Sequence, residues 1–125
     1  MSELSKVKFR TTVVEVGAEA RDFEEINMAI LFGDEAPDAL RSSCFIIQVQ
    51  PVADSIVVGD QLVINETHYD ITAVGGEVNM NLAQLGHIAI VFDGADKAEL
   101  PGTLYVEAKP YPQIDVDSVI EIGQA

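Results

Sequence analysis

Short segments in which apolar and polar residues alternate recur along almost the whole chain. Residues 7–13 show this most clearly, because Val7, Phe9, Thr11 and Val13 alternate with charged or polar neighbours. A period of two residues is typical of a β-strand that packs one face against a core. The periodicity therefore predicts strands rather than long helices.

Eight segments fit this description, and turn-forming residues separate them at intervals of about 8–12 residues. We expect strands at residues 7–13, 28–32, 44–50, 61–64, 68–74, 87–92, 103–109 and 119–122, with positions 45, 47 and 49 on one face. Many short strands of this kind predict an all-β domain, either a barrel or a sandwich.

Two short helical turns are expected between the strands. Pro37 suits the start of a turn over residues 38–41. Asn79 is expected to cap a second helix over residues 79–85, which Gly86 then ends.

The chain is strongly acidic. It has 125 residues, 48% of them apolar, which suits one compact domain over residues 1–125. Its 21 acidic and 7 basic residues give a formal net charge of −14, whereas a small soluble domain usually carries a magnitude of about 2–8. This charge repels phosphate backbones and anionic lipids, so we expect no nucleic-acid partner and no membrane insertion. A basic protein is the natural complement.

The cysteine content and the hydropathy of the chain indicate the cellular compartment in which the protein is expected. Cys44 is the single cysteine, which excludes an internal disulfide and fits a reducing environment. No apolar stretch approaches the ~18 residues of a membrane span, and the start of the chain lacks the apolar core of a secretion signal. We therefore expect a cytoplasmic protein.

Few residues are candidates for chemistry. The chain has no Gly-rich phosphate loop, nucleophile elbow or zinc-binding histidine pair. The acidic residues 93–99 lack the spacing of a calcium loop, and Cys44 has the apolar neighbours of a core thiol. We therefore expect no metal and no cofactor.

The two histidines are the remaining candidates. His68 is expected on the polar face of its strand, facing solvent, and is the secondary candidate. His87 directly follows Gly86, where a helix is expected to meet a strand, and such junctions are both exposed and well held. A half-buried imidazole with no chemical role is the alternative for His87.

A further set of residues resembles one protein family over nearly the whole chain. They are Thr11-Thr12, Gly17-Ala18, Ala36-Pro37, Leu40, Cys44-Phe45-Ile46, Tyr69, Thr72-Ala73-Val74-Gly75, Asn81-Leu82, Leu85-Gly86-His87, Phe92-Asp93-Gly94, Glu99 and Pro101-Gly102-Thr103. In their order and spacing the chain resembles the glucitol/sorbitol-specific IIA component of the bacterial phosphoenolpyruvate-dependent sugar phosphotransferase system.

The resemblance implies a small closed β-barrel and a cytoplasmic phosphocarrier. In such a protein a histidine nitrogen takes a phosphoryl group from the phosphocarrier HPr and passes it to the IIB part of the sugar transporter. A neutral imidazole suits this role because it is nucleophilic near its pKa of ~6.5. The implied partners are HPr and the IIB/IIC components. Exposed strand edges could also pair to form a homodimer, and the sequence does not decide between a monomer and a dimer.

The chain departs from the family pattern at the reacting residue. In the family the phosphorylated histidine directly follows Cys-Phe-Ile, and here that position is Ile47. A second histidine often lies two residues later, where this chain has Val49. Neither hydrocarbon can accept a phosphoryl group, so the family's acceptor does not transfer to this chain.

Three hypotheses follow for the function. His87 can accept the phosphoryl group if its strand neighbours residues 44–50. Alternatively, the chain docks with HPr or IIB without transferring anything and acts as a regulatory protein. As a third hypothesis, the barrel binds an unrelated partner.

Overall fold

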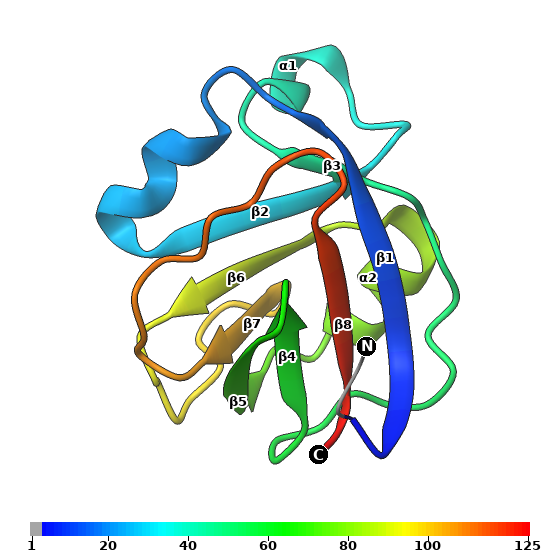
Figure 1. Cartoon of the computed structure of the whole chain (residues 1–125), viewed down its shortest axis with the longest axis vertical. Coiled ribbons are helices and arrows are strands. Elements are labelled where there is room, and N and C mark those ends of the chain that lie inside the picture. Colours follow the sequence, from blue (N-terminus) through cyan, green and yellow to red (C-terminus); the bar gives the residue numbers. More distant parts are fainter. Residues whose placement is uncertain (1–3) are drawn as a thin grey trace.

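Eight strands form a closed barrel in the computed structural model, which describes residues 4–125 (Figure 1). The strands are β1 (Lys6–Val16), β2 (Met28–Gly33), β3 (Phe45–Ile47), β4 (Gln61–Ile64), β5 (Thr67–Val74), β6 (Ile88–Phe92), β7 (Thr103–Val106) and β8 (Val119–Gln124). Their order around the barrel is β1-β3-β2-β6-β7-β5-β4-β8. The expected all-β fold and its closure are confirmed.

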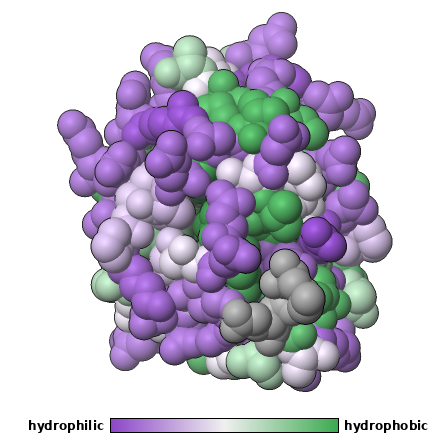
Figure 2. Space-filling view, in the orientation of Figure 1, coloured by the Kyte–Doolittle hydropathy of each residue, from purple (hydrophilic) through white to green (hydrophobic). Residues whose placement is uncertain are grey.

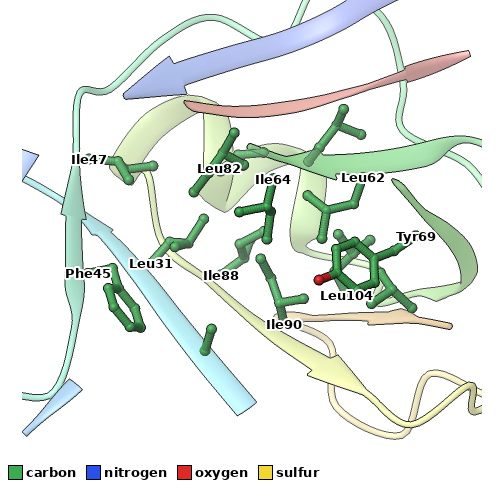
Figure 3. Close-up of a cluster of buried hydrophobic side chains, with 14 of the residues drawn as sticks. Leu31, Phe45, Ile47, Leu62, Ile64, Tyr69, Leu82, Ile88, Ile90 and Leu104 are labelled. Atoms are coloured by element: carbon green, nitrogen blue, oxygen red, sulfur yellow. The ribbon is translucent and has the colours of Figure 1, made fainter. Parts of the chain in front are cut away.

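Pairing of β8 with both β1 and β4 closes the barrel, and β1 and β8 run side by side in Figure 1. The β2–β3 and β6–β7 pairs are parallel, and the other pairs are antiparallel. Aliphatic side chains from different strands meet inside the barrel, as Figure 3 shows for Leu31, Leu62, Ile90 and Leu104. This continuous apolar interior is the main source of stability.

Within the described part of the chain, three short helices connect the strands: η1 (Ala20–Ile26), a 3₁₀-helix, and α1 (Asp38–Arg41) and α2 (Val78–Leu85). Both predicted helices are present, and Gly86 ends α2 as expected. The prediction that Asn79 caps α2 is wrong, because its side chain instead bonds the backbone nitrogen and oxygen of Ile56, at 2.7 and 3.2 Å. No helix within residues 4–125 is long and apolar enough to cross a membrane.

The start of β1 does not follow the predicted alternation. The register between β1 and β8 shifts between Val7 and Phe9, and this irregularity exposes Val7 and buries Lys8. The Lys8 ammonium donates to a carboxylate oxygen of Asp60 and to the carbonyl of Ser55, both at 2.7 Å. Lys8 is therefore a buried, paired charge rather than a solvent-facing one.

The third strand is shorter than predicted. β3 ends at Ile47, whereas the sequence predicts a strand to residue 50. The Thr11 hydroxyl donates to the carbonyl of Gln48 at 2.6 Å, and the Gln48 amide donates to the carbonyl of Thr12 at 3.3 Å. After these contacts the chain leaves the sheet and runs outside it as far as β4.

Candidate functional site

The loop after α2 crosses β2 backbone against backbone, and this crossing positions the candidate site. Gly86 adopts a left-handed conformation with φ of +67°, and a Cβ on it would lie 3.0 Å from the backbone nitrogen of Gly33. A Cβ on Gly33 would lie 2.5 Å from the carbonyl oxygen of Leu85. Because neither glycine has a side chain, the segments touch, and His87 comes to lie beside Phe32.

The imidazole of His87 stacks on the phenyl ring of Phe32, with ring centroids 4.1 Å apart and planes inclined by 12°. The side chain is half-buried, and this burial lowers the pKa of the imidazole below its ordinary value of 6.5. Within residues 4–125 no group bonds to either ring nitrogen, and no buried side-chain nitrogen lacks a partner. Both ring nitrogens of His87 therefore contact solvent, and the ring is neutral at pH 7.

The residue at the family's acceptor position lies in the core. Ile47 is 0% exposed and belongs to the main hydrophobic cluster drawn in Figure 3. Its Cδ1 atom lies 3.5 Å from the position that a Cβ on Gly86 would take. Ile47 thus packs beneath the crossing that positions His87, and it offers no atom that could accept a phosphoryl group.

Val49 lies on the outer side of the same crossing. The prediction that positions 47 and 49 share one strand face is wrong, because the chain leaves the sheet after Ile47. Val49 is 45% exposed, and its Cγ2 atom lies 2.4 Å from the position that a Cβ on Gly33 would take. The crossing is therefore covered by hydrocarbon from both sides.

The strand that follows His87 does not neighbour β3. β6 pairs with β2 and β7, and β2 lies between β6 and β3. His87 still lies close to the acceptor position, because Phe32 under its ring belongs to β2 and pairs with Ile46 of β3. The condition set from the sequence, that the strand of His87 neighbours residues 44–50, is therefore not met.

A pocket of about 210 Å³ opens next to this histidine. Its lining residues come from the ends of β2 and α2 and from the segments after β2 and β3: Phe32, Glu35, Pro37, Val49, Gln84 and Leu85. Phe32 both lines the pocket and carries the His87 ring. The candidate site therefore combines a free imidazole with an adjacent, mainly apolar hollow.

One acidic side chain lines the pocket, and two others belong to the same segment of the chain. Glu35 lines it, and Asp34 and Asp38 are exposed in the segment that leads into α1. Arg41 is the cation nearest in sequence, and its guanidinium pairs with Glu15 at 3.0 Å and with Asp34 at 2.9 Å. That pairing holds the pKa of the Glu15 carboxyl below its ordinary value. Among the lining residues, Glu35 is thus the one with a charged side chain.

The structure does not bring His68 into this site. His68 lies on β5, half-buried, with its Nδ1 atom 2.9 Å from the side-chain oxygen of Gln61. Two strands, β7 and β6, separate β5 from β2 around the barrel. Cys44 is buried, its thiol donates to the carbonyl of Leu40 at 3.1 Å, and burial raises its pKa. Cys44 therefore behaves as the core thiol that the sequence indicates.

Sequence reasoning missed the residues that assemble the site. Gly33 reads only as a turn residue and Phe32 only as part of an apolar run, because their contacts with residues 85–87 are long-range. The described residues 4–125 contain no group of three or more His, Cys, Asp or Glu side chains placed to hold a metal ion. The candidate chemical group at this site is the imidazole of His87.

The fold is that of a known class of phosphotransferase-system proteins. A solved structure described as a PTS system IIA component from Enterococcus faecalis V583 superposes with a TM-score of 0.79 and 31% sequence identity. The superposition covers 90% of this chain and 97% of that chain. A barrel of this architecture thus falls within the IIA components.

The comparison of sequences identifies the family. The model of the PTS system glucitol/sorbitol-specific IIA component matches residues 8–121, and the chain belongs to this family. Glucitol/sorbitol-specific EIIA components of Shigella flexneri and of Escherichia coli strain K12 are each 38% identical to it over 106 residues. These alignments cover 85% of this chain and 85% of each relative.

Proposed function

We propose that His87 is the phosphoryl acceptor of this IIA component, and that the protein carries a phosphoryl group from HPr to the IIB component of a sugar transporter. The observation that supports this most directly is the state of the His87 ring. It is neutral, free of hydrogen bonds within the described chain and open to solvent, and it lies above the position of the family's acceptor.

The transfer exchanges one nitrogen–phosphorus bond for another. A lone pair on a neutral ring nitrogen of His87 attacks the phosphorus of a phosphohistidine on HPr. The bond between phosphorus and the donor imidazole breaks, and its electron pair stays with the donor ring. The proton that leaves the His87 ring is balanced by the proton that the donor ring takes up. The second transfer, to IIB, begins from the phosphorylated His87.

Stacking on Phe32 orients the imidazole ring of His87. The phenyl face restricts rotation of the imidazole, and Phe32 is itself 8% exposed and so well held. A ring held in one orientation needs less reordering before an in-line attack. The lowered pKa keeps the imidazole in its nucleophilic form at pH 7.

A second candidate function is docking without transfer. Ile47 has replaced the family's acceptor with a buried hydrocarbon. Within residues 4–125 no lysine or arginine forms a hydrogen bond or ion pair with His87. A phosphoryl group on His87 would add negative charge to a chain of net charge −14 without a paired cation. These observations favour a protein that binds HPr or IIB without phosphoryl transfer and thereby regulates them.

One experiment separates the two functions. The chain is incubated with phosphoenolpyruvate, enzyme I and HPr, and its intact mass is measured. We expect a gain of one acid-labile phosphoryl group in the wild type, loss of that gain in His87→Gln and its retention in the control variant His68→Gln. A wild-type chain that binds HPr or IIB but gains no mass is a docking protein. A label that survives His87→Gln shows that the acceptor is another residue.

A further inference from the structure

We propose that the pocket beside His87 receives one apolar side chain from a partner protein whose surrounding surface is basic. The inference rests on the proposed function, because the partner must approach His87. It further specifies the pocket in which a side chain of the partner, the anchor, is buried, and the chemical character of that side chain. Leu85 and Val49 form the exposed apolar walls of the pocket, and Phe32 links it to the imidazole.

The apolar walls of the pocket are accessible to solvent. Leu85 is 48% exposed and Val49 is 45% exposed, and both line the same hollow. Hydrophilic residues dominate the face of the molecule drawn in Figure 2, and apolar residues emerge there only in places. Apolar side chains that gather around a hollow are typical of interaction sites, because covering them removes apolar area from water.

The size of the pocket selects its occupant. Pockets that bind small molecules usually enclose about 300–1,000 Å³, whereas this one encloses about 210 Å³. It has room for a single side chain such as leucine, methionine or phenylalanine. An anchoring side chain in a pocket is the arrangement in which protein interfaces concentrate their binding energy.

The charge around the pocket selects the partner's surface. Glu35 lines the pocket, Asp34 and Asp38 are exposed in the same segment of the chain, and Arg41 is already paired with Asp34 and Glu15. A lysine- or arginine-rich rim on the partner complements these carboxylates and accelerates association. A second copy of this chain would present the same carboxylates to itself, and an anionic lipid surface would also be repelled.

The pocket and the imidazole share one aromatic residue. Phe32 lines the pocket and also stacks on the His87 ring, 4.1 Å between centroids. A partner anchored in the pocket therefore has its neighbouring residues beside the imidazole. Docking there would bring a reactive group on the partner within reach of His87 without any change of the barrel.

The test measures affinity, which does not depend on phosphoryl transfer. Unphosphorylated HPr and the soluble IIB domain are titrated into the full chain by isothermal titration calorimetry at low salt. We expect binding of at least one of them and a dissociation constant about tenfold or more higher for Leu85→Lys. Glu35→Gln should weaken binding less and reduce its salt dependence.

Ile26→Lys is the matched control, because Ile26 is 58% exposed and lies before the opposite end of β2. It adds the same charge and should leave the affinity within about threefold of the wild type. Thermal melts of each variant verify that the barrel is folded.

The outcomes of this test and of the phosphorylation assay are distinct. Equal weakening by Leu85→Lys and Ile26→Lys, or unchanged affinity in Leu85→Lys, overturns the anchor even if the wild type is phosphorylated. Absence of binding to both HPr and IIB also overturns it. A wild type that gains no phosphoryl group but loses affinity through Leu85→Lys supports the anchor and refutes transfer through His87.

Discussion

At the scale of single residues, an imidazole ring and an aliphatic side chain lie on the two sides of one backbone crossing. His87 lies outside with its nitrogens open to solvent, and Ile47 lies inside with no exposed surface. Burial of a histidine disfavours its charged form, whereas burial of isoleucine is favourable. The same region of the barrel thus holds a half-buried imidazole directly beside a fully buried isoleucine.

The lowered pKa of His87 has a testable effect on stability. Because the folded chain holds this pKa below 6.5, the unfolded chain takes up the proton more readily below that pH. The wild type should therefore lose free energy of unfolding relative to His87→Gln as the pH falls below 6.5, and the difference should be constant above it. Urea denaturation of both proteins from pH 5 to 8 measures this. A difference that does not vary with pH would show that the ring is not desolvated.

At the scale of elements, the sequence predicts well where strands occur but predicts poorly at which residues they begin and end. The alternation over Tyr69, Ile71 and Ala73 correctly predicts the buried face of β5. The chain turns at Asn65 and Glu66, both with positive φ, between the antiparallel strands β4 and β5. Period-two patterns carry this information because neighbouring side chains point to opposite faces.

What the sequence could not predict depends on contacts between distant segments. The end of β3 follows from bonds between residues 11–12 and Gln48, and the exposure of Val7 follows from a register shift against β8. The candidate histidine could be selected by its position after a helix. The pocket beside it could not, because its walls come from four separate segments.

The glycine crossing gives a prediction at this scale. A methyl group at position 33 would meet the Leu85 carbonyl oxygen at 2.5 Å, so Gly33→Ala must separate α2 from β2. We expect a loss of about 1–3 kcal/mol in the free energy of unfolding, and loss of the stacking between His87 and Phe32. Urea denaturation and the chemical shifts of the His87 ring measure the two effects.

Gly76→Ala is the control for this variant, because nothing lies within 4 Å of a Cβ at position 76. Its stability should stay within about 0.5 kcal/mol of the wild type. Equal losses in the two variants would contradict a specific role for the crossing.

At the scale of the whole molecule, a buried ion pair fastens the segment between β3 and β4 to the barrel. The side chains of Lys8 and Asp60 are 3% and 4% exposed, and their charged atoms are 2.7 Å apart. Asp60 also accepts the backbone amide of Val57 at 2.9 Å, and Lys8 bonds the carbonyl of Ser55. The pair thus holds the segment that begins beside the candidate site.

Removing one member of this pair should be costly. Lys8→Met leaves the Asp60 carboxylate buried without its cation, and we expect a loss of about 3–5 kcal/mol in the free energy of unfolding. Lys6→Met removes the exposed pair with Asp54, in which both side chains are about half exposed, and should cost about 0–1 kcal/mol. Guanidinium denaturation of both variants tests this, and similar losses would show that burial of the Lys8 pair is unimportant.

Closure of the barrel by β1 and β8 determines when this protein can finish folding. The first strand formed on the ribosome pairs with the last, so during synthesis one edge of β1 waits for a partner until β8 has emerged. Pairing between strands so far apart in sequence slows folding, and an unpaired edge invites contacts with other chains. The nascent chain is therefore vulnerable to aggregation until β8 has left the ribosomal tunnel and paired with β1.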